Sequence, residues 1–374
     1  MACKENIISV LSDLISFKTD IPENSLAAIK YIAQLLEKSG FICDIQIFGT
    51  EKIPNLYAIW GHKKPNICFA GHVDVVGASS DWCTNPFKLE IRNGKVYGRG
   101  VADMKAALAC SISAALDMIK LYKISDKMSI SFLITGDEEG KAENGTRKML
   151  EHIKERYDMP DLSILGEPTS EHQIGDTVKI GRRGSINFQL KIRGIEAHVA
   201  YPEKAEYALE IALNISRELL IQNQYFSNST YLTITNIYTN NKNNNVTPSK
   251  VILEFNIRFS NQFTPDSLNR EISSIIKKHS QHFELTYHCN SLPFQQIANA
   301  KIQNFHKKIE EITGLKAHFS NKGGTSDARF ISKYFPVIEF GLFSNQAHKT
   351  NENAKLVDIN KLYEIYFQYL KTLL

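Results

Sequence analysis

Several ionisable side chains of this sequence lie where buried strands are expected to end. The stretch ICFAGHVDVVG, at 67–77, is a continuous apolar run typical of a strand covered on both faces, yet it contains His72 and Asp74. Because side chains alternate along a strand, positions i and i+2 point to the same side. Two ionisable groups on one side of a buried strand destabilise it unless they are paired or bound. This pair therefore indicates a functional site.

Four further segments place acids or a histidine in comparable positions. They are Asp103 in the glycine-rich turn YGRGVADMK, Glu138 and Glu139 after SFLITG, Glu167 after LSILG, and His348 in the loop GLFSNQAHKTNE. Ligands collect at the carboxyl ends of strands in open α/β sheets. Taken singly, Asp103 could cap its helix and the glutamates could form a solvated turn. Taken together, these carboxylates repel one another unless divalent cations neutralise them, which predicts a metal site.

The types of ligand suggest the metal and the chemistry. Imidazole and carboxylate groups without thiolates suit zinc in a catalytic site, or a similar divalent ion. There are enough of them for two ions that share a bridging carboxylate, with the metals about 3.5–4 Å apart as in aminopeptidases. One carboxylate would remain uncoordinated as the general base. Glu138 and Glu139 could divide these roles, because consecutive residues leave a turn in different directions.

The elements that must position these residues alternate between helix and strand. Apolar stripes predict two helices before Gly40, and strands follow at 43–48, 56–60 and 67–75. A long helical pattern starts after Asp103, and MSISFLIT, a helix at 145–157 and LSIL continue the alternation. This βαβ rhythm predicts an α/β domain with a mostly parallel sheet.

The middle of the chain has a different order of elements. The segments SINFQLKI, 205–220, YLTITNIY, VILEFNIRF, 266–278 and FELTYH predict β-α-β-β-α-β, the ferredoxin-like order. In VILEFNIRF apolar and polar residues alternate, which is typical of an antiparallel strand buried on one face. We therefore predict a discontinuous α/β domain, residues 1–178 and 294–374, with an inserted α+β domain at 179–293.

Bulk properties exclude some classes of protein. A chain of 374 residues favours two domains, and its net charge of +4 is too small and scattered to predict nucleic-acid binding, although it would not repel an acidic small molecule. Without a run of 18 apolar residues or a signal-peptide pattern, we expect neither a membrane span nor secretion. The six cysteines are spread singly, which is typical of reduced thiols in the cytoplasm.

A family resemblance now covers nearly the whole chain. The motifs GHVDVV, YGRGVADMK, TGDEEG, GEPT, RRGSINFQLKIRGIEAHVAYP and GGTSDARF occur in the order found in the aminoacylase/carboxypeptidase family of co-catalytic metallopeptidases, which the sequence resembles. The resemblance implies a zinc-exopeptidase-like α/β domain with a mostly parallel mixed sheet and an inserted ferredoxin-like dimerisation domain. GGTSDARF and HKTNE are most similar to members that cleave N-succinyl-LL-2,6-diaminopimelate to succinate and LL-2,6-diaminopimelate in lysine biosynthesis.

The resemblance also implies roles for individual residues. His72 and Glu167 would bind one zinc, Glu139 and His348 the other, and Asp103 would bridge them, with cobalt able to substitute for zinc. Three further residues would be catalytic. Asp74 would orient His72, and Glu138 would be the general base. His198 would reach the oxyanion from the inserted domain of a partner subunit in a homodimer. The implied substrate contacts are Ser185, Tyr201, Asn244, Asn245, Arg258, Gly324, Thr325 and Asn345.

Three positions depart from the pattern of the members with this activity. Ala328 replaces the usual Gly, Thr247 replaces a common Ile, and Gly77 stands where Pro often follows. None of these changes removes a ligand or a charge, so they bear on the fit of the substrate and not on the class of reaction.

Two kinds of alternative remain. The first is another N-acyl amino acid deacylase, such as an acetylornithine deacetylase-like enzyme, or a dipeptidase of the same family. The second is a metal-binding or regulatory protein without activity, which the seven intact metal-centre residues argue against. A nucleic-acid binder is a weaker alternative, because the sequence has no basic, aromatic patch.

Overall fold

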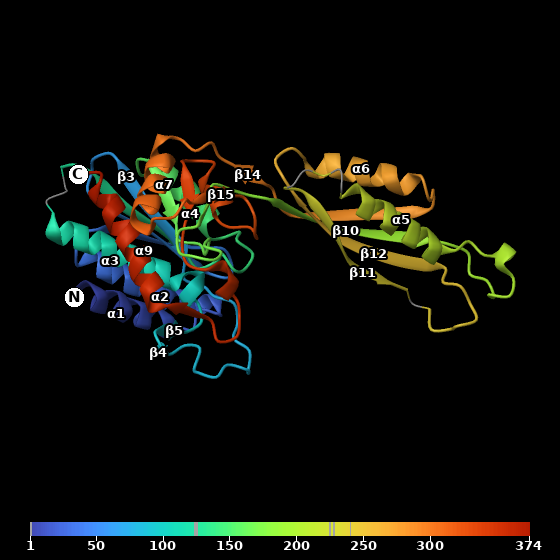
Figure 1. Ribbon diagram of the computed structural model, residues 1–374, viewed down its shortest axis with the longest axis horizontal. Coiled ribbons are helices and arrows are strands. Elements are labelled where there is room, and N and C mark those ends of the chain that lie inside the picture. The colour runs from blue at the N-terminus through green and yellow to red at the C-terminus, as the bar shows by residue number, and fades with distance from the viewer. Residues whose placement is uncertain (1, 123–125, 224–225, 227–228, 240) are drawn as a thin grey trace. The chain divides into compact units, whose positions relative to one another are not determined.

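The computed structural model describes residues 2–122, 126–223, 226, 229–239 and 241–374 and divides the chain into two compact units (Figure 1). Unit 1 comprises Met1–Ile180, Gln296–Ser320 and Ser326–Leu374, and unit 2 comprises Gly181–Gln295 and Asn321–Thr325. The inserted segment thus begins and ends two residues later than the predicted 179–293. Asn321–Thr325 groups with unit 2 instead of unit 1, and within unit 2 the Arg182 guanidinium donates to the carbonyl of Gly324 (3.0 Å).

Unit 1 is built on an eight-stranded mixed sheet with the order β1-β2-β6-β3-β7-β16-β8-β15. Its central strands β6, β3, β7 and β16 are parallel, as the βαβ rhythm predicts, while β1 and β2 run antiparallel at one edge. The strands are β1 (Ile42–Phe48), β2 (Ile53–Trp60), β3 (Asn66–His72), β6 (Ser129–Thr135), β7 (Leu162–Leu165), β8 (Thr177–Lys179), β15 (His318–Ser320) and β16 (Val337–Glu339).

Helices pack on this sheet through apolar stripes. One group lies side by side in the order α1, α3, α9, α7, while α2 contacts β1 and β2, and α4 contacts β2, β6 and α8. The helices are α1 (Ala2–Ser16), α2 (Pro22–Glu37), α3 (Ala106–Leu121), α4 (Thr146–Lys154), α7 (Ala300–Thr313), α8 (Ala328–Ile331) and α9 (Leu356–Lys371). Within the ranges that the structure describes, no helix has both the length and the apolarity needed to cross a membrane.

A small antiparallel sheet lies beside the carboxyl-terminal helix. It consists of β4 (Glu90–Arg92), β5 (Lys95–Tyr97) and β17 (Asn353–Lys355) in the order β17-β5-β4. Asn353 pairs with Tyr97, so this sheet brings the chain after residue 97 next to the loop that precedes residue 353. Both loops contain residues of the candidate site described below.

The strand that contains His72 is shorter than predicted. We expected it to reach Val75, but β3 ends at His72. Its parallel partner β6 ends at Thr135, whose carbonyl accepts from Val73, and the next backbone hydrogen bond joins Val75 to Thr19 instead of to a strand. Asp74 therefore lies in an extended loop beyond the sheet.

Unit 2 has the predicted β-α-β-β-α-β order, and its four-stranded antiparallel sheet is arranged β11-β12-β10-β13. Alternate residues of β12, from Val251 to Phe259, are buried against α5 and α6, which confirms the expected one-sided strand. The elements are β10 (Gly184–Arg193), α5 (Ala208–Gln222), β11 (Tyr231–Tyr238), β12 (Lys250–Phe259), α6 (Pro265–Lys277) and β13 (Phe283–Ser291). A short pair, β9 (Gly181–Arg182) with β14 (Phe294–Gln295), lies where the chain enters and leaves the unit.

Candidate metal centre

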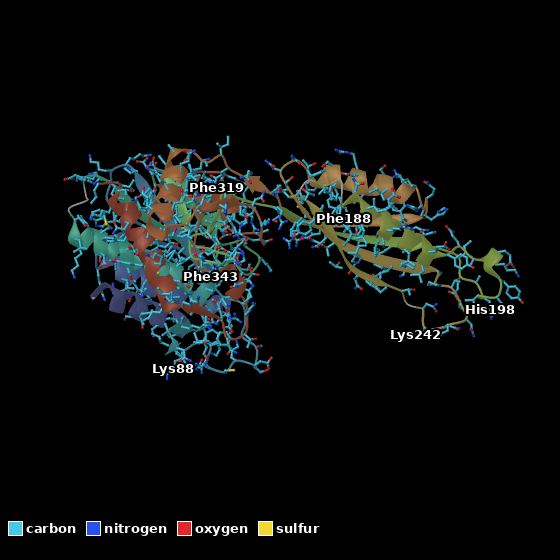
Figure 2. All side chains as sticks on the ribbon, in the orientation of Figure 1. Lys88, Phe188, His198, Lys242, Phe319 and Phe343 are labelled. Atoms are coloured by element: carbon cyan, nitrogen blue, oxygen red, sulfur yellow. The ribbon has the colours of Figure 1, made fainter. Side chains whose placement is uncertain are left out.

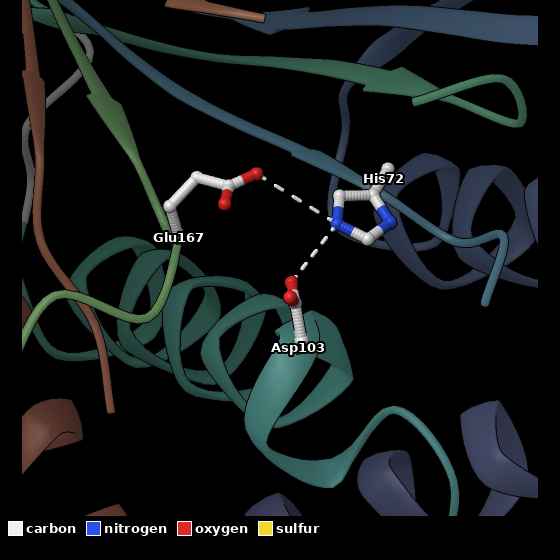
Figure 3. A group of neighbouring side chains, drawn as sticks. All are labelled: His72, Asp103 and Glu167. Atoms are coloured by element: carbon white, nitrogen blue, oxygen red, sulfur yellow. Dashed lines mark hydrogen bonds and ion pairs between the residues drawn. The ribbon is translucent and has the colours of Figure 1, made fainter. Parts of the chain in front are cut away.

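Three predicted ligands meet at the carboxyl ends of the central strands of unit 1 (Figure 3). His72 ends β3, Glu167 follows β7, and Asp103 lies in the segment Val101–Lys105 directly before α3. All three side chains are buried. The His72 Nε2 atom lies 3.2 Å from Asp103 Oδ1 and 3.7 Å from Glu167 Oε1.

A second group shares Asp103 with the first. His348 Nε2 lies 2.8 Å from Glu139 Oε1 and 3.3 Å from Asp103 Oδ2. The two carboxylate oxygens of Asp103 therefore face different histidines, Oδ1 towards His72 and Oδ2 towards His348. Within each group the potential ligand atoms all lie within 4.8 Å of one another.

These separations fit the donor set of a two-metal site. Two ligands of a tetrahedral zinc ion, each about 2.0–2.1 Å from the metal, lie about 3.3 Å apart. The four distances from the two Nε2 atoms to carboxylate oxygens range from 2.8 to 3.7 Å. Imidazole nitrogens and carboxylate oxygens are donors that zinc and similar divalent ions accept. The donor set and its spacing therefore fit two divalent ions, and Asp103 is the residue that faces both histidines.

The electrostatics of the group point the same way. Burial alone would lower the pKa of His72, but its hydrogen bond to Asp103 and the nearby Asp74 and Glu138 carboxylates raise this pKa well above its usual value. Hydrogen bonds to Asp103 and Glu139 raise the pKa of His348 to about 10. The clustered carboxylates thus favour positive charge at this position, which is also the charge that divalent cations would supply.

Glu138 has surroundings different from those of its neighbour Glu139. It is partly buried, and desolvation together with the negative charge of Glu167 raises its pKa well above the usual value of a glutamate. A carboxylate that holds a proton more tightly is a better general base at neutral pH. A carboxylate oxygen of Glu138 also lies within 4.8 Å of a ring nitrogen of His72, so the side chain is close to the proposed metal ligands.

Asp74 contacts both His72 and the turn that contains the two glutamates. His72 Nδ1 lies closest to the backbone carbonyl of Asp74 itself, at 2.9 Å, and 3.6 Å from the carboxylate Oδ1. The other carboxylate oxygen accepts the backbone N–H groups of Glu138 (3.0 Å) and Glu139 (2.8 Å). Asp74 therefore holds the Glu138–Glu139 turn in addition to its expected position beside His72.

Three charged residues beside the group were not predicted from the sequence. Lys105 is fully buried, its ammonium donates to the carbonyl of Phe17 (3.1 Å), and burial lowers its pKa to about 7. Arg99 and Glu352 form a buried ion pair (2.9 Å). All three lie inside quoted motifs, Arg99 and Lys105 in YGRGVADMK and Glu352 in HKTNE, so the motifs were the only indication of a role.

The substrate residues expected in unit 2 form two groups. Ser185 on β10 pairs directly with Arg258 on β12, and Asn256 donates to the Ser185 hydroxyl (3.2 Å). Directly paired residues of antiparallel strands share a face, and this face is the one opposite α5 and α6. Ser185 and Arg258 are therefore neighbours, as a shared carboxylate contact requires.

The second group lies in loops at the other end of the unit 2 sheet (Figure 2). His198 and Tyr201 are exposed, with ring centroids 5.9 Å apart. Val199 donates to the carbonyl of Asn245 (3.0 Å), so this loop and the exposed Asn244–Asn245 loop lie together. Ser185 lies at the start of β10 and His198 follows its end, so about 26 Å of strand separates the two groups, at about 3.3 Å per residue.

The remaining predicted contacts are on two loops. Gly324 and Thr325 belong to unit 2, where the Gly324 carbonyl accepts from Arg182. Asn345 is an exposed residue of unit 1, three positions before His348 in the same loop.

Comparison with known proteins places this geometry in a family. The model of peptidase family M20/M25/M40 matches residues 68–372. A succinyl-diaminopimelate desuccinylase of Rickettsia bellii is 45% identical over 372 residues, covering 96% of this chain and 95% of the relative. The enzyme of the same name from Rickettsia akari is 45% identical over 377 residues, covering 97% and 98%.

Solved structures agree on the fold. A tripeptidase from Staphylococcus aureus superposes with a TM-score of 0.78 at 20% identity, covering 99% of this chain and 98% of that one. A Bacillus subtilis protein described as a dinuclear metal binding peptidase superposes with a TM-score of 0.70 at 15% identity, covering 99% and 98%. Since the family model and the relatives each span most of the chain, the protein belongs to peptidase family M20/M25/M40.

Proposed function

We propose that this protein is a metal-dependent amide hydrolase that cleaves N-succinyl-LL-2,6-diaminopimelate to succinate and LL-2,6-diaminopimelate, in lysine and diaminopimelate biosynthesis. The position of Asp103, with one oxygen towards each of two histidines, is the observation that supports a two-metal amide hydrolase. Relatives named for this reaction, aligned over nearly the full length, support the substrate.

The proposed cofactors are two zinc ions per subunit, with cobalt able to substitute. His72, Asp103 and Glu167 would hold one ion, and Asp103, Glu139 and His348 the other. When bound, such ions polarise the amide carbonyl and lower the pKa of a water molecule.

In this scheme Glu138 transfers the proton. It accepts a proton from the attacking water, whose oxygen adds to the succinyl carbonyl carbon, and delivers that proton to the amine nitrogen as the C–N bond breaks. The products are succinate and the free amine. Asp74 keeps the Glu138 main chain in place through its backbone hydrogen bond.

Each group of predicted substrate residues is assigned a part of the substrate. Ser185 and Arg258 would bind a substrate carboxylate through a hydroxyl and a guanidinium, and Gly324, Thr325 and Asn345 would complete the contacts from their loops. His198 would stabilise the oxyanion, with Tyr201, Asn244 and Asn245 beside it.

The distance between these two groups supports a homodimer, provided that both groups act on one substrate. About 26 Å of strand separates Ser185 from the end of β10, which is more than one small substrate can span. One site that uses both groups therefore takes them from different subunits. Unit 2 also has exposed apolar side chains on α5 and on the edge strand β11, which are candidates for burial against a partner: Leu209, Leu213, Leu220, Ile221, Tyr231, Ile237 and Tyr238.

The remaining elements of the proposal concern the surroundings of the protein. We place it in the cytoplasm, because Cys43, Cys68, Cys83, Cys110 and Cys289 are free thiols, which suits a reducing compartment. Its proposed partner is an acidic small molecule, and we expect it to act without nucleic acid or membrane.

The test is a substrate panel on protein of known metal content. Purified protein loaded with zinc is assayed on N-succinyl-LL-2,6-diaminopimelate, on N-acetylornithine and on dipeptides. We expect two metal ions per subunit and the highest kcat/KM on the succinylated substrate. A higher kcat/KM on N-acetylornithine or a dipeptide would reject the substrate and keep the reaction class, whereas no hydrolysis of any compound would reject the enzyme.

A further inference from the structure

Glu352, four residues after His348, has a carboxylate that accepts three backbone N–H groups. The side chain is 1% exposed. Its Oε1 accepts the N–H groups of Ala102 (2.7 Å) and Asp103 (3.1 Å), and its Oε2 accepts the N–H of Gly100 (2.9 Å). Glu352 thus binds the main chain of Asp103 and of the turn that leads to it.

Arg99 completes this arrangement from the other side. It is 3% exposed, and its Nη1 donates to Glu352 Oε2 (2.9 Å) and to the carbonyl of Lys349 (3.2 Å). Its Nη2 donates to the carbonyl of Gly77 (3.2 Å), and its guanidinium lies 5.1 Å from the ring centroid of Trp82.

The pair therefore joins the three segments that contain most of the proposed metal ligands. Gly77 follows the loop of His72, Asp103 has its own N–H bound, and Lys349 is the residue after His348. His348 has a φ of 63°, a left-handed conformation that is unfavourable for a residue with a Cβ and must be held by its surroundings. The hydrogen bond from Arg99 to the carbonyl of the next residue, Lys349, helps to hold this conformation.

The small sheet explains how residues so distant in sequence meet. β5 and β17 pair antiparallel, with Tyr97 opposite Asn353, and the Gly98 N–H donates to the carbonyl of Glu352 (3.2 Å). Arg99 is the second residue after β5, and Glu352 is the residue directly before β17. The strand register thus places the two charges side by side.

We propose that Glu352, with Arg99, is a positioning residue of the metal centre, which holds the Asp103 turn and the His348 loop at the spacing that two divalent ions require. The inference rests on the proposed function. A purely structural role would stabilise the fold without affecting the affinity of the folded protein for metal. The two roles therefore differ in a measurable quantity.

The variant Glu352→Gln distinguishes the positioning role from a purely structural role. An amide has one acceptor oxygen, so its NH₂ group must face donors where the carboxylate now accepts, and Arg99 loses its counter-charge. We expect zinc affinity, measured by competition with a chelator, to fall about 10–100-fold, as for other residues that orient metal ligands. The absorption spectrum of the cobalt-loaded protein should change as well, because it reports ligand geometry. At saturating zinc, kcat should fall while KM changes little, because neither residue is a proposed substrate contact.

Asp161→Asn is the matched control. Asp161 accepts the N–H of Asn66 (2.9 Å) and pairs with Lys301 (2.6 Å) at the start of β3, the end of the strand opposite His72. The change to Asn removes the ion pair with Lys301, although the amide oxygen can still accept the Asn66 N–H, so it should lower the unfolding temperature and leave zinc affinity unchanged.

Arg99→Lys is the second variant, for the case that Glu352→Gln does not fold. It keeps the charge but cannot donate to Lys349, Gly77 and Glu352 at once, so zinc affinity should again fall. Zinc affinity equal to wild type in a folded Glu352→Gln or Arg99→Lys protein would overturn the inference. Wild-type protein that neither binds zinc nor hydrolyses an amide would instead reject the proposed function.

Discussion

Glu138 and Glu139 are consecutive residues in different environments. Glu139 lies 2.8 Å from His348, while Glu138 is the glutamate whose pKa burial and the charge of Glu167 raise. The backbone N–H groups of both are bound by one oxygen of Asp74, so their main chain is held in common. In the proposed mechanism the two side chains have separate tasks, metal binding for Glu139 and proton transfer for Glu138.

The first prediction tests this division. Glu138→Gln should retain two metal ions per subunit and lower kcat about 10²–10⁴-fold, because an amide cannot accept the proton of the attacking water. Metal analysis and steady-state kinetics measure the two effects. Glu143→Gln, the same change at an exposed position of the same loop, is the control. Near wild-type turnover of Glu138→Gln would show that another group is the base.

The second prediction concerns Arg258, which pairs with Ser185 across two strands. Arg258→Lys should lower kcat/KM for the succinylated substrate about tenfold or more, since a hydrogen bond to a charged group contributes about 1.5–3 kcal/mol. An ammonium cannot reproduce the two parallel bonds of a guanidinium. The loss should be much smaller for an acylated amine that lacks the carboxylate.

Arg193→Lys is the control, because it makes the same substitution at the far end of β10 and should leave kcat/KM for both substrates unchanged. Equal losses on both substrates, or no loss on either, would remove Arg258 from the substrate site.

At the scale of elements, ends of strands and caps of helices determine where side chains are presented. β3 stops at His72 because its partner β6 stops at Thr135, and this leaves Asp74 free to turn towards the glutamates. In unit 2, helix α6 begins with a capping box. The Thr264 hydroxyl accepts the N–H of Ser267 (3.1 Å), and the Ser267 hydroxyl accepts the N–H of Thr264 (2.9 Å).

The third prediction tests this capping box. Thr264→Ala should lower the free energy of unfolding of unit 2 by about 1 kcal/mol, because an N–H at the first turn of α6 loses its acceptor. Urea unfolding followed by circular dichroism measures the change. Ser274→Ala, at an exposed position within the same helix, removes a hydroxyl without removing a cap and should have little effect. Similar losses in both variants would mean that the cap contributes nothing specific.

At the scale of the whole molecule, the proposed site requires two copies of the chain. The Ser185–Arg258 group and the His198 group lie at opposite ends of the same sheet. A single substrate can meet both groups only if one of them belongs to a partner subunit.

The fourth prediction follows from this sharing. His198→Ala and Glu138→Gln should each be nearly inactive, the former because loss of one oxyanion donor costs about 10²–10³ in kcat. If subunits exchange, half of the dimers in an equal mixture are mixed and each has one intact site, so activity should recover to about a quarter of wild type. Sedimentation velocity establishes the dimer independently. A fully active monomer, or no recovery despite proven exchange, would exclude shared sites.

Much of the fold and the ligand group could be predicted from local patterns. Apolar periodicity and element order are properties of short segments, and they predicted the α/β unit and the β-α-β-β-α-β order of unit 2. Acids and histidines at strand ends predicted one group of ionisable side chains, because parallel strands present their carboxyl ends at one edge. The family resemblance then implied which of them are the metal ligands, namely His72, Asp103, Glu139, Glu167 and His348.

Other features depend on contacts between distant segments. The carboxylate of Glu352 binds the N–H of Ala102 across 250 residues, and that of Asp74 binds the turn of Glu138. No periodicity encodes which buried carboxylate meets which backbone donor, since this depends on where loops end and on the pairing of β5 with β17. The residue types required for a metal centre are therefore local information, whereas the groups that hold its ligands at the correct spacing are determined only when the chain has folded.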